Sequence, residues 1–62
     1  MDRVEKLTIR RSLTSTVVKL VVTESGITID YSVKTYEHAI PQAIQQARNG
    51  CARLLKLAEE AA

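Results

Sequence analysis

The sequence predicts one α+β domain over residues 1–62, in which a three-stranded antiparallel β-meander is followed by one long amphipathic helix. Three observations carry this prediction. Apolar and polar residues alternate in residues 4–11 and 27–36, a valine-rich run lies between them, and the last third repeats apolar residues at helical spacing. The order is therefore β-β-β-α, and we expect the domain to be oligomeric.

The first strand is predicted over residues 4–11, where Leu7 and Ile9 fall on one face and Lys6, Thr8 and Arg10 on the other. A period of two over this length is typical of a half-buried strand. Residues 12–15 are polar around a single leucine and are predicted as a hairpin loop, although no Asn-Gly or Asp-Gly pair marks the turn.

The central strand is predicted over residues 16–23, which contain four valines. Branched side chains lose rotamer freedom in a helix and favour strands. Apolar residues occupy both faces of this segment, as is usual for a strand with neighbours on both sides. Glu24, Ser25 and Gly26 then predict a tight reversal in which Gly26 is free to adopt a positive φ.

The third strand is predicted over residues 27–36 and the helix over residues 40–62, with Pro41 in its first turn. Asn49 and Gly50 are able to end one helix and start another. The apolar residues keep their helical phase across this pair, which favours one helix in which Gly50 permits the close approach of another backbone.

These elements predict a sheet with one apolar and one polar face. The helix is expected to cover the apolar face, made of Leu7, Ile9, Val18, Leu20, Val22, Ile27, Ile29, Tyr31 and Val33. The open face is expected to show Lys6, Thr8, Arg10, Val17, Lys19, Val21, Thr28, Asp30, Ser32 and Lys34.

Size and composition predict the oligomeric state. A single core in a chain below about 70–80 residues seldom supplies more than about 3–5 kcal/mol of net stability. One cysteine cannot form an intramolecular disulfide, and one histidine with one cysteine cannot complete a structural zinc site. Association of copies is the remaining source of stability. We expect a cytoplasmic protein with no cofactor, no metal and no membrane span.

The chain is not expected to be an enzyme. Cys51 lies on the apolar helix face as a structural cysteine, and no residue orients His38 as its base. Asp30 and Glu37 would lie more than about 20 Å apart along one strand, too far to act as a catalytic carboxylate pair. Two glycines cannot provide a phosphate-binding loop.

The oligomer interface is predicted on the helix, whose apolar arc covers about 160° where about 100° is enough to dock on a sheet. Ile40, Ile44, Cys51, Leu55 and Ala58 are expected to cover the sheet. The flank left over is Ala43, Ala47, Gly50, Leu54, Leu57 and Ala61, with the two leucines as anchors. Pairing through the outer strand, residues 4–11, is the competing interface.

The function predicted from these features is binding. A small homo-oligomer with a surplus apolar face is expected to bind another protein, as small phage or mobile-element proteins bind a host factor. The alternative is a nucleic-acid-binding module that uses the basic residues of the open face, Lys6, Arg10, Lys19 and Lys34. The absence of Phe and Trp argues against base stacking. A third possibility is a sponge for a small anion at the oligomer interface.

Overall fold

The computed structural model describes residues 3–61. The strands are β1 (Arg3–Arg11), β2 (Thr16–Glu24) and β3 (Ile27–Thr35), and they are followed by the 3₁₀ turn η1 (Glu37–Ala39) and the helix α1 (Ile40–Ala61). The predicted β-β-β-α order is confirmed. Ala62, predicted as the last helical residue, lies outside the described residues.

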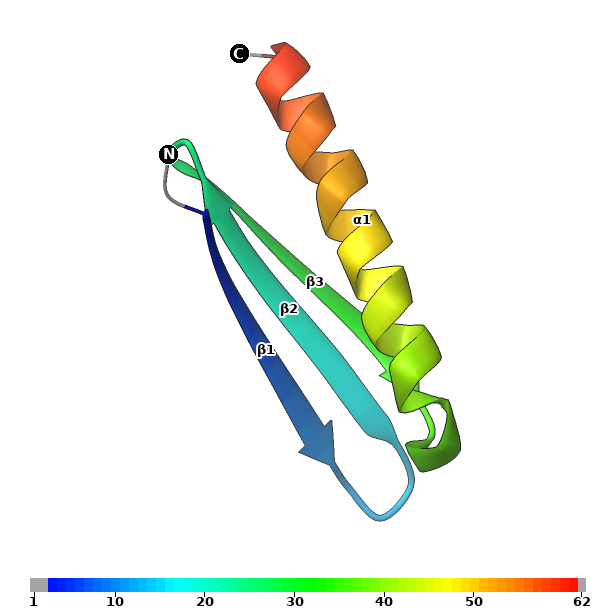
Figure 1. Cartoon of the computed structure of the whole chain (residues 1–62). Coiled ribbons are helices and arrows are strands. Elements are labelled where there is room, and N and C mark those ends of the chain that lie inside the picture. The colour runs from blue at the N-terminus through cyan, green and yellow to red at the C-terminus, as the bar shows by residue number, and fades with distance from the viewer. Residues whose placement is uncertain (1–2, 62) are drawn as a thin grey trace.

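The three strands form one antiparallel sheet with β2 in the centre (Figure 1). Leu20 of β2 lies opposite Leu7 of β1 and opposite Tyr31 of β3. Because side chains alternate along each strand, this register places all the residues predicted for the apolar face on the helix side of the sheet. The prediction of the two faces is confirmed.

The β2–β3 connection is a two-residue hairpin turn. Ser25 and Gly26 both have positive φ, 55° and 79°, as the type I′ turn that matches the twist of paired strands requires. The positive φ predicted for Gly26 is confirmed, and Ser25 adopts one as well. The β1–β2 loop is closed by the Ser12 N–H, which donates to the Ser15 carbonyl oxygen at 2.9 Å.

The core lies between α1 and the middle of the sheet. Val18 and Val22 are fully buried and Leu20 is 2% exposed. The helix residues that close this core are Ala43, Ala47, Cys51 and Leu55. Ile9, Ile29, Tyr31, Val33, Ile40 and Ile44 pack around its margin.

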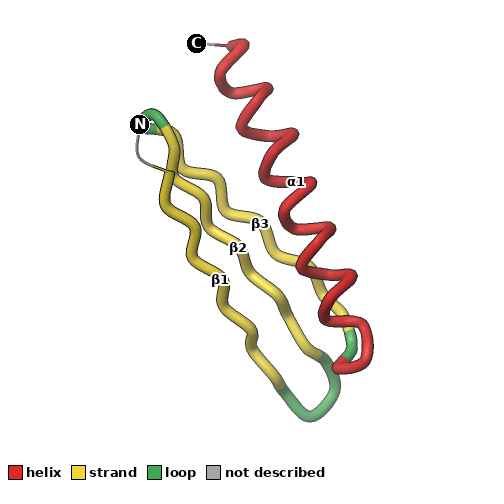
Figure 2. Tube along the Cα trace, viewed as in Figure 1, coloured by secondary structure: helices red, strands yellow, loops and turns green. Residues whose placement is uncertain are grey.

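The helix lies to one side of the sheet. It packs chiefly against β3 and then against β2, and Figure 2 shows it running beside these strands with β1 farthest away. The expectation that the helix covers the whole apolar face is therefore wrong at β1, where Leu7 is exposed and Ile9 only half-buried, because α1 lies over the other two strands.

α1 continues without a break through Asn49 and Gly50, so the prediction of one helix is confirmed. Gly50 is buried against the aromatic ring of Tyr31, and a Cβ at position 50 would lie 2.5 Å from two atoms of that ring. A close approach was expected at Gly50 from another backbone, and in the structure it is made by a side chain of the protein's own sheet.

Candidate binding surfaces

The open sheet face gathers the four basic residues predicted for it. Lys6 and Arg10 come from β1, Lys19 from β2 and Lys34 from β3, and the strand register places all four on the side away from α1. A shallow depression in this face is lined by Lys6, Thr8, Arg10, Lys19 and Val21.

The charge on this face is predominantly positive. Asp30 is the one carboxylate among the residues of the face that the structure describes, and it contacts the Lys19 amino group at 3.4 Å. Three of the four cations have no carboxylate beside them on the described part of this face. The face therefore carries an excess of positive charge suited to an anionic ligand.

The predicted helix flank is divided by the structure. Ala43 is 2% exposed, Ala47 is fully buried, and Gly50 is buried against Tyr31. The expectation that these three residues remain partly exposed is wrong, because α1 turns them toward the sheet. Leu54 (39% exposed), Leu57 (55% exposed) and Ala61 are the members left at the surface.

A second apolar surface lies on β1. Leu7 is 42% exposed and Ile9 is half-buried on the helix side of the sheet, because α1 lies over the other two strands. β1 is also an edge of the sheet, and an edge strand presents backbone groups able to pair with another strand.

Charged side chains border this apolar surface at both ends of β1. At one end, Arg3 contacts Glu5 at 3.1 Å and Glu24 at 3.5 Å. At the other end, the Arg11 guanidinium donates two hydrogen bonds to Glu37, at 2.7 and 3.1 Å. The hydrogen bond from Arg11 holds the pKa of the Glu37 carboxyl below its usual value.

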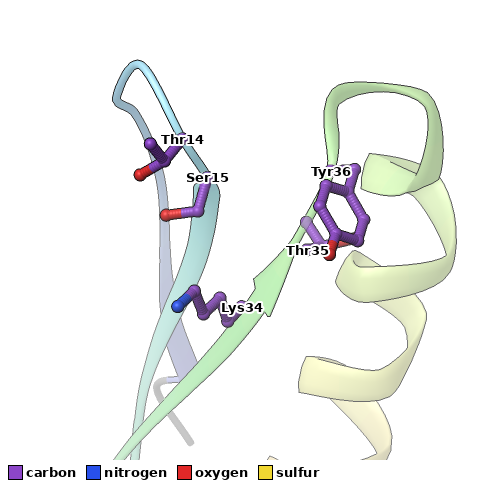
Figure 3. Close-up of a pocket in the computed structure, with 5 residues that line it drawn as sticks. All are labelled: Thr14, Ser15, Lys34, Thr35 and Tyr36. Carbon is purple, nitrogen blue, oxygen red and sulfur yellow. The ribbon is translucent and has the colours of Figure 1, made fainter.

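A polar pocket lies where β3 ends, lined by Thr14, Ser15, Lys34, Thr35 and Tyr36 (Figure 3). Figure 3 shows the Lys34 amino group directed toward the strand that carries Ser15, with the Tyr36 ring on the other side of the pocket. One amino group with several hydroxyls can hydrogen-bond a small anion. Of its lining residues, only Lys34 was predicted from the sequence to bind an anion.

Tyr36, which lines this pocket, forms an exposed aromatic pair with His38. Tyr36 is 65% exposed, and its ring stacks on His38 with centroids 5.9 Å apart and planes 4° from parallel. The sequence signal for this pair was two aromatic residues separated by one residue, at the end of the predicted third strand and before the helix. Such a pair offers a flat surface for another ring.

Cys51 belongs to the core. It is 1% exposed, and its Sγ lies 3.8 Å from the Leu20 carbonyl oxygen, to which it donates. Burial raises the pKa of the thiol, and the charge of Glu5 raises it further. A buried thiol with a raised pKa is a poor nucleophile. His38 stacks on Tyr36 instead.

Two further features concern metals and membranes. Within residues 3–61, no three His, Cys, Asp or Glu side chains gather as a metal site would require. The same part of the chain contains no helix whose length and apolar character would let it cross a membrane.

Comparisons of the chain with protein-family models, with curated proteins and with solved structures found no match.

Proposed function

We propose that the protein is a non-enzymatic binding protein that works as a homo-oligomer and binds another protein. The observation that carries this proposal is the exposure of large apolar side chains on β1 and on α1. Leu7 is 42% exposed on β1, and Leu54 and Leu57 are 39% and 55% exposed on α1. Two separate apolar surfaces suit two kinds of contact, one between copies of the chain and one with a partner.

The size of the core supports association of copies. The fully buried side chains of the core are small, Val18, Val22 and Cys51 being the largest. A chain of 62 residues with a core of this kind is marginal alone, and burial of apolar surface between copies stabilises the fold at about 25 cal/mol per Å².

Light scattering at micromolar concentration tests this function. We expect a mass at least twice the 6.9 kDa of one chain. A monomer at this concentration would contradict the homo-oligomer. Leu57→Glu distinguishes the two apolar surfaces: if Leu57 contacts a different protein, the variant keeps its oligomeric mass, whereas an interface between helices would dissociate.

Binding of nucleic acid on the open sheet face is a second candidate function. The observation in its favour is that Lys6, Arg10, Lys19 and Lys34 share one face with a single described carboxylate. Each phosphate neutralised by a cation releases counterions, so the affinity of this face for an oligonucleotide would fall steeply with salt.

A salt series with a generic oligonucleotide tests the second candidate. Arg10→Ala is expected to reduce the slope of log affinity against log salt by about 1. Arg53→Ala is the matched control, because Arg53 is an exposed cation of α1 outside the open sheet face. Equal slopes for both variants would contradict binding through the sheet.

A further inference from the structure

We propose that two copies of the chain pair edge to edge through β1, antiparallel about a two-fold axis at Thr8, with Leu7 of each copy opposite Ile9 of the other. The result is one continuous six-stranded sheet that carries both helices on the same side. This inference rests on the proposed homo-oligomer and names the surface through which it forms.

The hydrogen-bond pattern of the sheet decides which backbone N–H and C=O groups of β1 point away from β2. In a two-residue hairpin the residues that flank the turn, here Glu24 and Ile27, exchange hydrogen bonds. Hydrogen-bonded positions alternate along an antiparallel pair, so every second residue of β2 from Glu24 bonds to β3. The residues between them bond to β1.

The β1 register then assigns the edge. Lys6 lies opposite Val21, and Thr8 lies opposite Lys19, so these β1 residues bond to β2. The β1 residues between them direct their N–H and C=O groups away from β2, toward the open edge of the described sheet. These residues are Arg3, Glu5, Leu7, Ile9 and Arg11.

The same five residues carry their side chains on the helix side, where the surface changes from charged to apolar and back. Leu7 and Ile9 form the apolar middle, Arg3 and Glu5 one charged end, and Arg11 the other. An antiparallel copy places unlike ends together, because Glu5 comes from one end of the strand and Arg11 from the other.

Three registers pair most of the nine β1 residues with the second copy, with the two-fold axis at Lys6, at Leu7 or at Thr8. An axis at Leu7 sets Arg3 opposite Arg11 of the second copy. An axis at Lys6 sets Glu5 opposite Leu7 and Lys6 opposite itself. Like charges directly opposite each other destabilise a strand pair, and matched apolar pairs stabilise it.

With the axis at Thr8, every pair of β1 residues on the helix side joins either two apolar side chains or two unlike charges. Leu7 then lies opposite Ile9, and Glu5 opposite Arg11 of the second copy. Since Glu5 already contacts Arg3 and Arg11 already contacts Glu37, each end becomes a row of four charges that alternate in sign. This complementarity favours a second copy as the occupant of the edge.

On the open face the same register is unfavourable, because Lys6 lies opposite Arg10 of the second copy and their like charges repel. Both side chains are exposed on that face, as Arg3 and Arg11 are in the register centred on Leu7. The unlike charges of Glu5 and Arg11, which only the axis at Thr8 sets opposite each other, therefore decide between these registers. An anion on the open face would reduce the repulsion between Lys6 and Arg10. The register therefore predicts that a polyanion tightens the dimer, because coupling between two binding events is reciprocal.

Disulfide cross-linking tests the register in a Cys51→Ala background. Lys6→Cys, Leu7→Cys and Thr8→Cys are oxidised in parallel and compared on a non-reducing gel. With the axis at Thr8, two Thr8 residues form a non-hydrogen-bonded pair with Cα atoms about 4.5 Å apart, within the range of about 4.4–6.8 Å that disulfides span. Thr8→Cys is expected to cross-link at least about ten-fold faster than the other two variants.

Leu57→Cys in the same background is the matched control, since position 57 is also exposed but lies on α1. An oligomer that cross-links fastest at position 57 would overturn pairing through β1 and support the helix interface. Fastest cross-linking at position 6 or 7 would overturn the register, and an oligomer that cross-links at none of the four positions would overturn the edge pairing. A monomer in light scattering would instead overturn the homo-oligomer itself.

Amide hydrogen exchange on the unmodified protein provides a second test. The N–H groups of Leu7 and Ile9 are expected to be protected, because they bond to the second copy. Asp30 and Ser32 are the matched controls, because by the same alternation their N–H groups point to the outer edge of β3. Equal exchange at both edges of an oligomer would contradict pairing through β1.

Discussion

Gly50→Ala has two opposite effects on stability: it favours the helix, and it places a Cβ too close to the Tyr31 ring. Within a helix, alanine is favoured over glycine by about 1 kcal/mol. In this protein the added Cβ would lie 2.5 Å from Cε2 and Cζ of Tyr31, whereas carbon atoms in contact lie about 3.5–4.0 Å apart. The ring or the helix must therefore move by about 1 Å.

The expected change in the free energy of unfolding follows from these two effects. Insertion of a methyl group into a packed site costs about 1–3 kcal/mol, and the gain in helix propensity offsets about 1 kcal/mol of it. Gly50→Ala should therefore lower the free energy of unfolding by up to about 2 kcal/mol. In a Tyr31→Val background the ring is gone, and the same substitution should raise the free energy of unfolding by about 1 kcal/mol.

Urea denaturation followed by circular dichroism at a fixed protein concentration measures both values. Ala52→Gly, at an exposed position of the same helix, gives the propensity effect alone and serves as the control. If Gly50→Ala changes the free energy of unfolding equally with and without the Tyr31 ring, the close contact between α1 and β3 is wrong.

Three further predictions concern the sheet and its charges. Leu20→Ala should cost about 2–5 kcal/mol because Leu20 is 2% exposed in the core; thermal melting within a few degrees of the parent would mean that the sheet register is wrong. Ser25→Gly should raise the free energy of unfolding by about 1 kcal/mol, because the side chain at φ 55° is strained, and an unchanged urea midpoint would contradict the turn geometry. Because Arg11 lowers the pKa of Glu37 in the folded state, this pair stabilises the protein above the ordinary carboxyl value of 4.5, and the stabilisation is lost as the pH falls below that value through the lowered pKa. Glu37→Gln should remove this part of the acid sensitivity, and identical acid melting curves for parent and variant would show that the pair contributes nothing.

The fold was largely predictable because its signals are local. The alternation in residues 27–36 identified β3, and the apolar phase across Gly50 identified one continuous helix. The assignment of Lys6, Arg10, Lys19 and Lys34 to one face required only the period of two.

The orientation of the helix on the sheet was not predictable in the same way. An apolar arc of about 160° permits several orientations, and the choice among them depends on where the helix lies across the strands. The Tyr31 ring on β3 fits against Gly50, the smallest residue of α1, and this contact turns Ala43 and Ala47 toward the sheet. Ala43, Ala47 and Gly50, half of the residues expected to face a partner, are therefore buried, while β1 is left uncovered.

The aromatic pair of Tyr36 and His38 was not predicted either. Tyr36 was predicted as the last residue of the third strand, and His38 belongs to no periodic pattern. Their rings meet because β3 ends at Thr35 and η1 turns the chain directly after it.

We expect the chain to associate with itself through β1. Sedimentation equilibrium of the unmodified protein and of Leu7→Lys, at the same micromolar concentrations, tests this association. The parent should sediment at twice the 6.9 kDa of one chain, and Leu7→Lys, which sets a charge beside Ile9 of the second copy, should sediment as a folded monomer. A monomeric parent, or a folded Leu7→Lys variant that keeps the mass of the dimer, would contradict it.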